Sequence, residues 1–298
     1  MHTFANLGYW RVGGPMERFL CPATPDDLRV ALLDARERGR GFFVLGRGSN
    51  LLVPDEGLSG TTVQLGGEFC TIREVDGNAE TVDLRVGAGV WNDVLLKRQL
   101  GKLSGLGALA GVPGTMGGAI AMNAGTALGE IDKVVTRVEG LDAEGRACTI
   151  ERRDLPMRYR EGGLPVGFVV TAAVLRLSRA GADDEARRVE AHKAHRKATQ
   201  PLNQPSCGSV FRNPPGDSAG RLIQDAGLKG WRSGNAQISE KHANFIVNLG
   251  GAQANDVLCC IRTAMQAVWA RSRVLLSPEV HIVGTWDEKL WPVLPARE

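Results

Sequence analysis

Residues 103–129 combine eight glycines with a complete absence of charged side chains. Glycine, Pro113 and several hydroxyl side chains interrupt this stretch too often for a membrane-spanning apolar helix. So many glycines indicate a backbone that bends sharply and lets a ligand approach closely. Because the stretch contains no cation, backbone N–H groups would hold a bound anion, as they do at helix N-termini. We interpret it as a cofactor cradle, and a glycine-rich packing segment is the alternative.

A second glycine-rich turn, GRGSN at residues 46–50, follows an apolar run at 42–45. A helix, a strand and a glycine loop in this order are typical of nucleotide-binding α/β units. The dinucleotide fingerprint would need a third glycine where Leu51 stands, and a helix that begins there. Residues 51–54 instead continue in an extended pattern. On these residues alone, the loop is either part of a nucleotide site or a plain tight turn.

Three polar residues outside the glycine loops could act in a site or be purely structural. Arg160 stands beside Tyr159, and its planar guanidinium group could bind a carboxylate or remain a solvated surface charge. Ser209 follows a glycine, but it is not in a GxSxG elbow because Phe211 holds the last position. Glu279 begins an apolar run and could be a surface acid or a carboxylate of the site.

Composition and spacing argue against several other classes of protein. His192 and His195 are three residues apart, but no further ligand stands at metal spacing, so we expect no metal site. The six cysteines show no CxxC pairing and are expected to be reduced thiols in a cytoplasmic protein. A net charge of +3, with basic and acidic residues well mixed, indicates no nucleic-acid surface. The first residues lack the apolar segment of a signal peptide.

The elements that would position these residues are mixed helices and strands. Thr24 as N-cap, Pro25 at N1 and Gly39 as the stop predict the first helix. Helical spacing also predicts helices at residues 90–100, 183–198, 217–226 and 254–272. Apolar runs predict strands at residues 42–45, 82–86, 133–141, 146–151, 166–177, 244–249 and 278–284. A chain of 298 residues has length for about two domains, and the two prolines within residues 199–205 place the boundary there.

Three separated segments, taken together, resemble one enzyme family. They are LGRGSNLLV at residues 45–53, AGVPGTMGGAIAMNAG at 110–125 and CGSVFRNP at 207–214. RYRE around Arg160 and SPEVHIVG at 277–284 complete the set in the expected order. Over about residues 3–286 the chain resembles the UDP-N-acetylenolpyruvoylglucosamine reductases, also called UDP-N-acetylmuramate dehydrogenases or the MurB family.

The resemblance implies an α+β fold with a two-lobed FAD-binding domain of the vanillyl-alcohol-oxidase type and a smaller α+β substrate-binding domain. The first domain would span residues 1–200, with lobes at about 1–65 and 66–200, and the second residues 201–298. The short path from residue 160 to 199 resembles the shorter class of the family, which lacks an extra tyrosine-bearing loop. Gly162 departs from the serine of many relatives, which concerns the hydrogen bonding of its loop and not the role of Arg160.

The resemblance also implies a reaction of peptidoglycan precursor synthesis. NADPH would reduce non-covalently bound FAD and leave, and the enolpyruvyl ether of UDP-N-acetylglucosamine would then occupy the same cleft. Hydride from the flavin and a proton from the protein would yield UDP-N-acetylmuramate. Arg160 would hold the substrate carboxylate, Glu279 would orient the site, and Ser209 would donate the proton. The implied enzyme is a cytoplasmic monomer that binds neither nucleic acid nor membrane.

The predicted FAD contacts are Gly46, Arg47, Gly48, Ser49, Asn50, Pro113, Gly114, Thr115, Gly117, Gly118, Ala119, Asn123, Ala124 and Gly125. The predicted substrate contacts are Tyr159, Asn213, Lys229 and His242. Two rival functions share parts of this pattern. A flavoprotein oxidase of a sugar or alcohol would share the glycine loops without needing Ser209 and Glu279 as a pair. A non-catalytic nucleotide-binding module would bind no flavin.

Overall fold

The computed structural model describes residues 2–287 of the chain, which divide into two compact units. Unit 1 contains residues 2–17, 48–59 and 196–287, and unit 2 contains residues 18–47 and 60–195. The predicted lobe at about 1–65 is therefore shared between both units. The reason is packing, because Trp10, Val12 and Leu52 belong to the hydrophobic core of the C-terminal segment.

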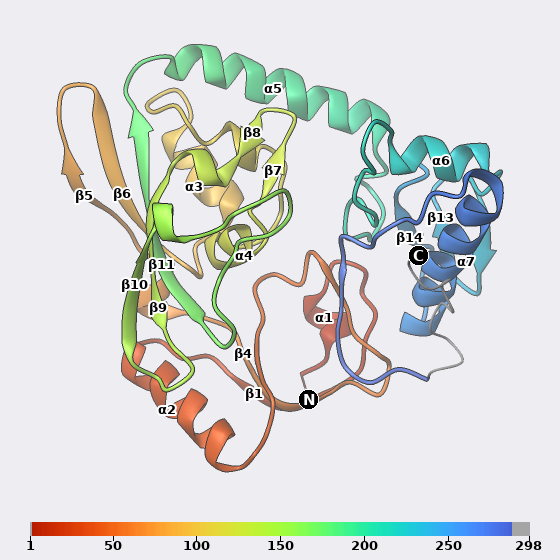
Figure 1. Cartoon of the computed structure of the whole chain (residues 1–298), viewed down its shortest axis with the longest axis horizontal. Helices are drawn as coiled ribbons and strands as arrows, with labels where there is room; N and C mark the ends of the chain where they lie inside the picture. Colours follow the sequence, from red (N-terminus) through yellow and green to blue (C-terminus); the bar gives the residue numbers. More distant parts are fainter. Residues whose placement is uncertain (1, 288–298) are drawn as a thin grey trace. The chain divides into compact units, whose positions relative to one another are not determined.

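Unit 2 is built on a five-stranded antiparallel sheet in the order β10-β9-β11-β6-β5 (Figure 1). Its strands are β5 (Ile72–Gly77), β6 (Thr81–Gly87), β9 (Val135–Leu141), β10 (Ala147–Glu151) and β11 (Val169–Ser178). The central strand β11 has eight buried residues out of ten. It is accordingly the most continuously apolar strand of the sequence, as a strand with neighbours on both sides and helix α4 packed against it requires.

Helices and short segments complete unit 2. Helix α2 (Pro25–Glu37) begins with the predicted Thr24 cap, which forms a reciprocal capping box with Asp27. A smaller sheet has the strand order β1-β4-β2. Three further elements cross the division between the units and lie mostly in unit 2: β1 (Met16–Leu20), β4 (Leu58–Val63) and α5 (Ala182–Thr199). The remaining elements of unit 2 are β2 (Phe42–Val44), η1 (Gly67–Cys70), α3 (Asn92–Gln99), η2 (Gly107–Leu109), α4 (Met116–Ala121), β7 (Gly125–Thr126), β8 (Gly129–Glu130), η3 (Ile131–Lys133) and η4 (Arg152–Asp154).

Unit 1 packs a long helix against a small antiparallel sheet in the order β12-β13-β14 (Figure 1). In helix α7 (Ala254–Ser272) the apolar residues at helical spacing are buried, as their spacing predicts. The indole Nε1 of Trp10 donates to the carbonyl of Ile246 at 2.6 Å, which anchors the N-terminal segment in this unit. The other elements are α1 (Phe4–Leu7), β3 (Leu51–Leu52), α6 (Ala219–Asp225), β12 (Arg232–Ser233), β13 (Ala236–Ile238), β14 (Ile246–Asn248) and β15 (His281–Ile282).

The expectation of an α+β fold is confirmed, and every helix and strand predicted from the sequence is present. The predicted strand at 278–284 is shorter than expected, because only His281 and Ile282 pair with β3. The sequence reasoning missed strands β1, β4, β5, β7, β8, β12 and β13, the short helix α1, and helix α4, which lies inside the glycine cradle. No helix within residues 2–287 combines the length and apolar character needed to cross a membrane.

Candidate active site

The predicted cofactor cradle forms a tight loop followed by helix α4. Thr115 caps this helix by accepting a hydrogen bond from the N–H of Gly118 at 3.4 Å. The loop is fastened by two backbone bonds, from Asn92 to Gly114 at 3.1 Å and from Met116 to Val90 at 2.8 Å. Within residues 2–287, no hydrogen bond uses the backbone N–H of Gly114 or Thr115. These two donors at the start of α4 suit a pyrophosphate, so the cradle fits FAD.

The first part of the other glycine loop reaches the cradle within unit 2. A Cβ atom at Gly46 would stand 2.9 Å from the hydroxyl oxygen of Thr115, which shows how closely the two loops approach. The guanidinium carbon of Arg47 lies 4.1 Å from the centre of the Trp91 ring. The same guanidinium pairs with Asp93 at 3.3 Å. Two loops that the sequence separates by more than sixty residues therefore meet in space.

Arg160 lies in a tight turn that packs on the end of helix α4. Arg158 and Glu161 close this turn with reciprocal backbone bonds of 2.8 and 2.9 Å. Arg160 itself has a left-handed backbone, with φ of 60°, and its guanidinium carbon lies 4.7 Å from the ring centre of Tyr159. After the turn, the N–H of Gly162 donates to the carbonyl of Ala121 at 3.0 Å. The turn that contains Arg160 is thus bonded to helix α4, the helix that follows the loop of the cradle.

The close packing of this turn on helix α4 requires a glycine at position 162. A Cβ atom there would stand 2.7 Å from the carbonyl oxygen of Ala121 and still closer to that of Ile120. A side chain at this position would therefore push the loop away from α4.

Ser209 and Glu279 come together in unit 1. The strand-like segments that carry them are joined by a bridge between Phe211 and Pro278, and the N–H of Glu279 donates to the carbonyl of Val210 at 2.7 Å. Both Ser209 and Glu279 are half-buried. Backbone pairing thus brings together two segments that lie more than sixty positions apart in the sequence.

The second half of the GRGSN loop is attached to this pair. The side-chain amide of Asn50 donates to the carbonyl of Glu279 at 3.1 Å, and the N–H of His281 donates to the carbonyl of Asn50 at 3.0 Å. The thiol of Cys207 is buried against the carbonyls of Gly48 and Leu51, at 3.8 and 3.7 Å. Burial raises the pKa of this thiol to about 12, so it is an inert packing group.

The predicted substrate contacts differ in their surroundings. The side-chain oxygen of Asn213 accepts from the N–H of Ala219 at 3.1 Å, at the start of α6. Lys229 is exposed and His242 half-buried. Burial lowers the pKa of the His242 imidazole, and the positive charge of Lys229 lowers it further. Lys229 and His242 are therefore neighbours in unit 1, whereas Tyr159 belongs to unit 2.

The sequence reasoning missed two groups beside the cradle. Trp91 is 49% exposed and forms a backbone bridge with Thr115, and it stacks on Arg47. The glycine pair before it, at residues 87 and 89, follows a strand and could have indicated this turn. The second group is a buried polar network around Asn123 and Asp132, whose members carry no sequence signal of their pairing.

Comparison with known proteins first defines the class. A family model described as an FAD-binding domain matches residues 16–151, which defines the chain as an FAD-binding flavoprotein and confirms the expected cofactor. The C-terminal domain of UDP-N-acetylenolpyruvoylglucosamine reductase matches residues 200–283.

Whole-chain relatives define the family. The chain is 45% identical over 280 residues to UDP-N-acetylenolpyruvoylglucosamine reductase from Alkalilimnicola ehrlichii, covering 94% of this chain and 92% of the relative. The enzyme of the same name from Myxococcus xanthus is 43% identical over 281 residues, covering 94% and 90%. The crystal structure of the reductase (MurB) from Thermus caldophilus matches with a TM-score of 0.81 and 38% identity, over 94% of this chain and 97% of that one. The chain belongs to the UDP-N-acetylenolpyruvoylglucosamine reductase family.

Proposed function

We propose that this chain reduces the enolpyruvyl group of UDP-N-acetylglucosamine enolpyruvate to UDP-N-acetylmuramate, in peptidoglycan precursor synthesis. NADPH is the proposed hydride donor, and it shares one cleft with the sugar nucleotide. Membership of the family supports the reaction. The observation that carries the proposal is the backbone pairing of Val210, the residue after Ser209, with Glu279. A plain flavin oxidase has no need of a serine and a carboxylate in this arrangement.

Bound FAD would supply hydride transfer, and the chain supplies binding, orientation and a proton. The N–H groups of Gly114 and Thr115 would hold its pyrophosphate. The closed turn presents the Arg160 guanidinium, whose fork suits the substrate carboxylate and stabilises the negative charge that develops beside it.

Ser209 is the proposed proton donor to the carbon next to that carboxylate. A serine hydroxyl is a weak acid, so it needs firm placement and a strongly basic acceptor such as an enolate. The backbone pairing of Val210 with Glu279 provides the placement, and the buried Cys207 holds the same segment against the loop at residues 48–51. Glu279 orients the site from the neighbouring strand.

A monomeric enzyme in the cytoplasm completes the proposal. All six cysteines are free thiols, which supports a reducing compartment. The expected membership of the shorter class stays a prediction.

The test separates two half-reactions of the purified, FAD-loaded protein under anaerobic conditions. NADPH should bleach the flavin absorbance, and UDP-N-acetylglucosamine enolpyruvate should restore it with formation of UDP-N-acetylmuramate. Bleaching by a sugar or an alcohol without NADPH would instead support an oxidase. A protein that binds no FAD would support a nucleotide-binding module and overturn the proposal.

A further inference from the structure

Asn123 is a fully buried residue whose amide is engaged by the protein at both ends. Its Nδ2 group donates to the carbonyl of Arg158 at 3.0 Å and approaches the Glu130 carboxylate at 3.4 Å. Its Oδ1 atom accepts from the backbone N–H of Asp132 at 3.1 Å. The residue is 0% exposed and has a left-handed backbone, with φ of 42°. These bonds tie the end of the glycine cradle to the turn that contains Arg160.

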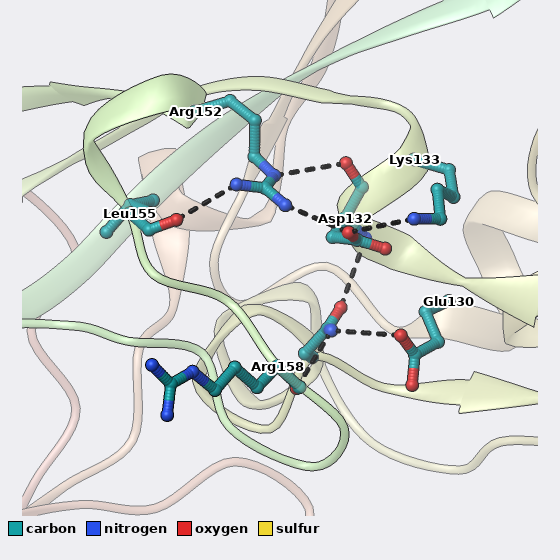
Figure 2. A network of polar contacts seen from close by, with 7 residues as sticks. Glu130, Asp132, Lys133, Arg152, Leu155 and Arg158 are labelled. Atoms are coloured by element: carbon teal, nitrogen blue, oxygen red, sulfur yellow. Dashed lines mark hydrogen bonds and ion pairs between the residues drawn. The ribbon is translucent and has the colours of Figure 1, made fainter.

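A partly buried ion pair extends this network to the start of the same loop. One oxygen of the Asp132 carboxylate receives a bond from Arg152 at 2.9 Å, and the Arg152 guanidinium also reaches the carbonyl of Leu155 at 2.9 Å. Figure 2 shows Arg152 placed between Leu155 and Asp132. The Asp132 side chain is only 8% exposed, and Lys133 contacts it from the exposed side at 3.4 Å. Arg152 therefore joins the segment at Asp132 to the backbone at Leu155.

The loop at residues 155–162 is therefore fixed at three points. Arg152 binds the carbonyl of Leu155, Asn123 binds the carbonyl of Arg158, and the N–H of Gly162 binds helix α4. The last two points lie on either side of Arg160. A residue in the left-handed region keeps that conformation only where its surroundings enforce it.

We propose that Asn123, supported by Asp132 and Arg152, is a positioning residue that aims Arg160 at the substrate carboxylate. Asn123 acts through the turn and not by touching substrate, because both ends of its side-chain amide are hydrogen-bonded to the protein. One of these partners is the carbonyl of Arg158, two positions before Arg160. This inference rests on the proposed function, in which Arg160 binds that carboxylate. It assigns Asn123 to the substrate step, whereas the sequence pattern assigned it to the cofactor.

Asn123→Gly is the decisive variant, since glycine adopts the left-handed backbone freely and only the amide is lost. Loss of the bond to Arg158 should weaken binding of UDP-N-acetylglucosamine enolpyruvate by about tenfold, the effect of one net hydrogen bond. FAD affinity, measured by flavin fluorescence, and the rate of bleaching by NADPH should stay within about twofold of wild type.

Arg152→Lys, which keeps the charge but loses the fork to Leu155, should also weaken substrate binding, but less than Asn123→Gly does. Lys133→Ala, the matched control on the exposed side of Asp132, should change nothing measurable.

A double-mutant cycle provides the readout that a purely structural role would not move. In an Arg160→Ala background, Asn123→Gly should cause no further loss of substrate affinity, because the residue it positions is gone. Additive losses would overturn the proposal, as would an equal loss of FAD affinity and NADPH reduction. If Asn123→Gly fails to fold, the cycle is run with Arg152→Lys and judged by the same outcomes. A wild-type protein that does not react with the substrate would refute the proposed function instead.

Discussion

Replacement of Gly162 by alanine tests how tightly the Arg160 turn must pack on helix α4. The added Cβ atom would stand 2.7 Å from the carbonyl oxygen of Ala121 and closer still to that of Ile120. Both neighbours are backbone atoms of the helix end and cannot rotate away. The turn itself is exposed at Arg158, Tyr159 and Glu161, so we expect the loop to move and the helix to stay.

The cost has two parts. Separation of the loop breaks the bond from Gly162 to Ala121, observed at 3.0 Å, which costs about 1 kcal/mol. Residual overpacking adds about 1–3 kcal/mol. We therefore expect unit 2 to lose about 2–4 kcal/mol of unfolding free energy, and less if the turn swings fully into solvent. Because the movement displaces Arg160, affinity for the enolpyruvyl substrate should fall by at least about tenfold in either case.

Urea unfolding followed by circular dichroism measures the first effect, and substrate titration of the oxidised, FAD-loaded protein measures the second. Gly118→Ala is the matched control on the same helix, because its Cβ atom would meet only the Thr115 hydroxyl at 3.7 Å, an ordinary contact. Its stability should be unchanged or higher, since alanine favours helix. If Gly162→Ala keeps wild-type stability and wild-type substrate affinity, the close packing of loop and helix is not what places Arg160.

Three further predictions concern other parts of the site. Ser209→Ala should leave bleaching of the flavin by NADPH largely intact but slow its reoxidation by the substrate about 10²–10⁴-fold, the usual effect of a lost general acid. In rapid-mixing measurements, equal slowing of both steps would mean that Ser209 only supports the flavin. Trp91→Ala should free the stacked Arg47 and weaken FAD binding by about 0.5–1 kcal/mol, the value of an exposed cation–π contact. Trp91→Phe should restore part of the lost FAD affinity, and an unchanged FAD affinity of Trp91→Ala in fluorescence titrations would argue against a role of the Arg47–Trp91 contact in FAD binding. Iodoacetamide at pH 8 should label the exposed Cys148 and spare the buried Cys207, whose pKa is raised to about 12; rapid labelling of Cys207 in a mass-spectrometric time course would contradict its burial.

Local signals in the sequence were sufficient for the longer helices and for four of the five strands of the main sheet. Thr24 and Pro25 predicted the start of α2, and the apolar spacing of residues 254–272 predicted the buried face of α7. Caps and periodicity act within one or two turns of the chain, so they can be recognised without knowledge of the fold. The glycine content of residues 103–129 indicated a sharply bending loop, and its binding of an anion stays a prediction.

The tertiary structure alone decided how distant polar groups are combined. Asn123 stands among glycine-loop residues in the sequence, but its amide binds Arg158, 35 positions further on. In the sequence, Gly162 is only a glycine in a loop. In the fold it lies against the backbone carbonyls at the end of α4, where a side chain does not fit. No spacing rule predicts such pairs, because they depend on how loops between strands of the sheet return to the same helix.

The first 65 residues show the same limit at the level of the fold. Helix α2 and strand β2 could be predicted from local patterns. The division of these residues between two units instead depends on Trp10, which inserts into the core around Ile246. Apolar burial is non-directional and does not depend on separation along the chain. The types and local order of the residues therefore predicted the longer helices, most of the main sheet and the family resemblance, while long-range packing decided which side chains each loop could hold in place.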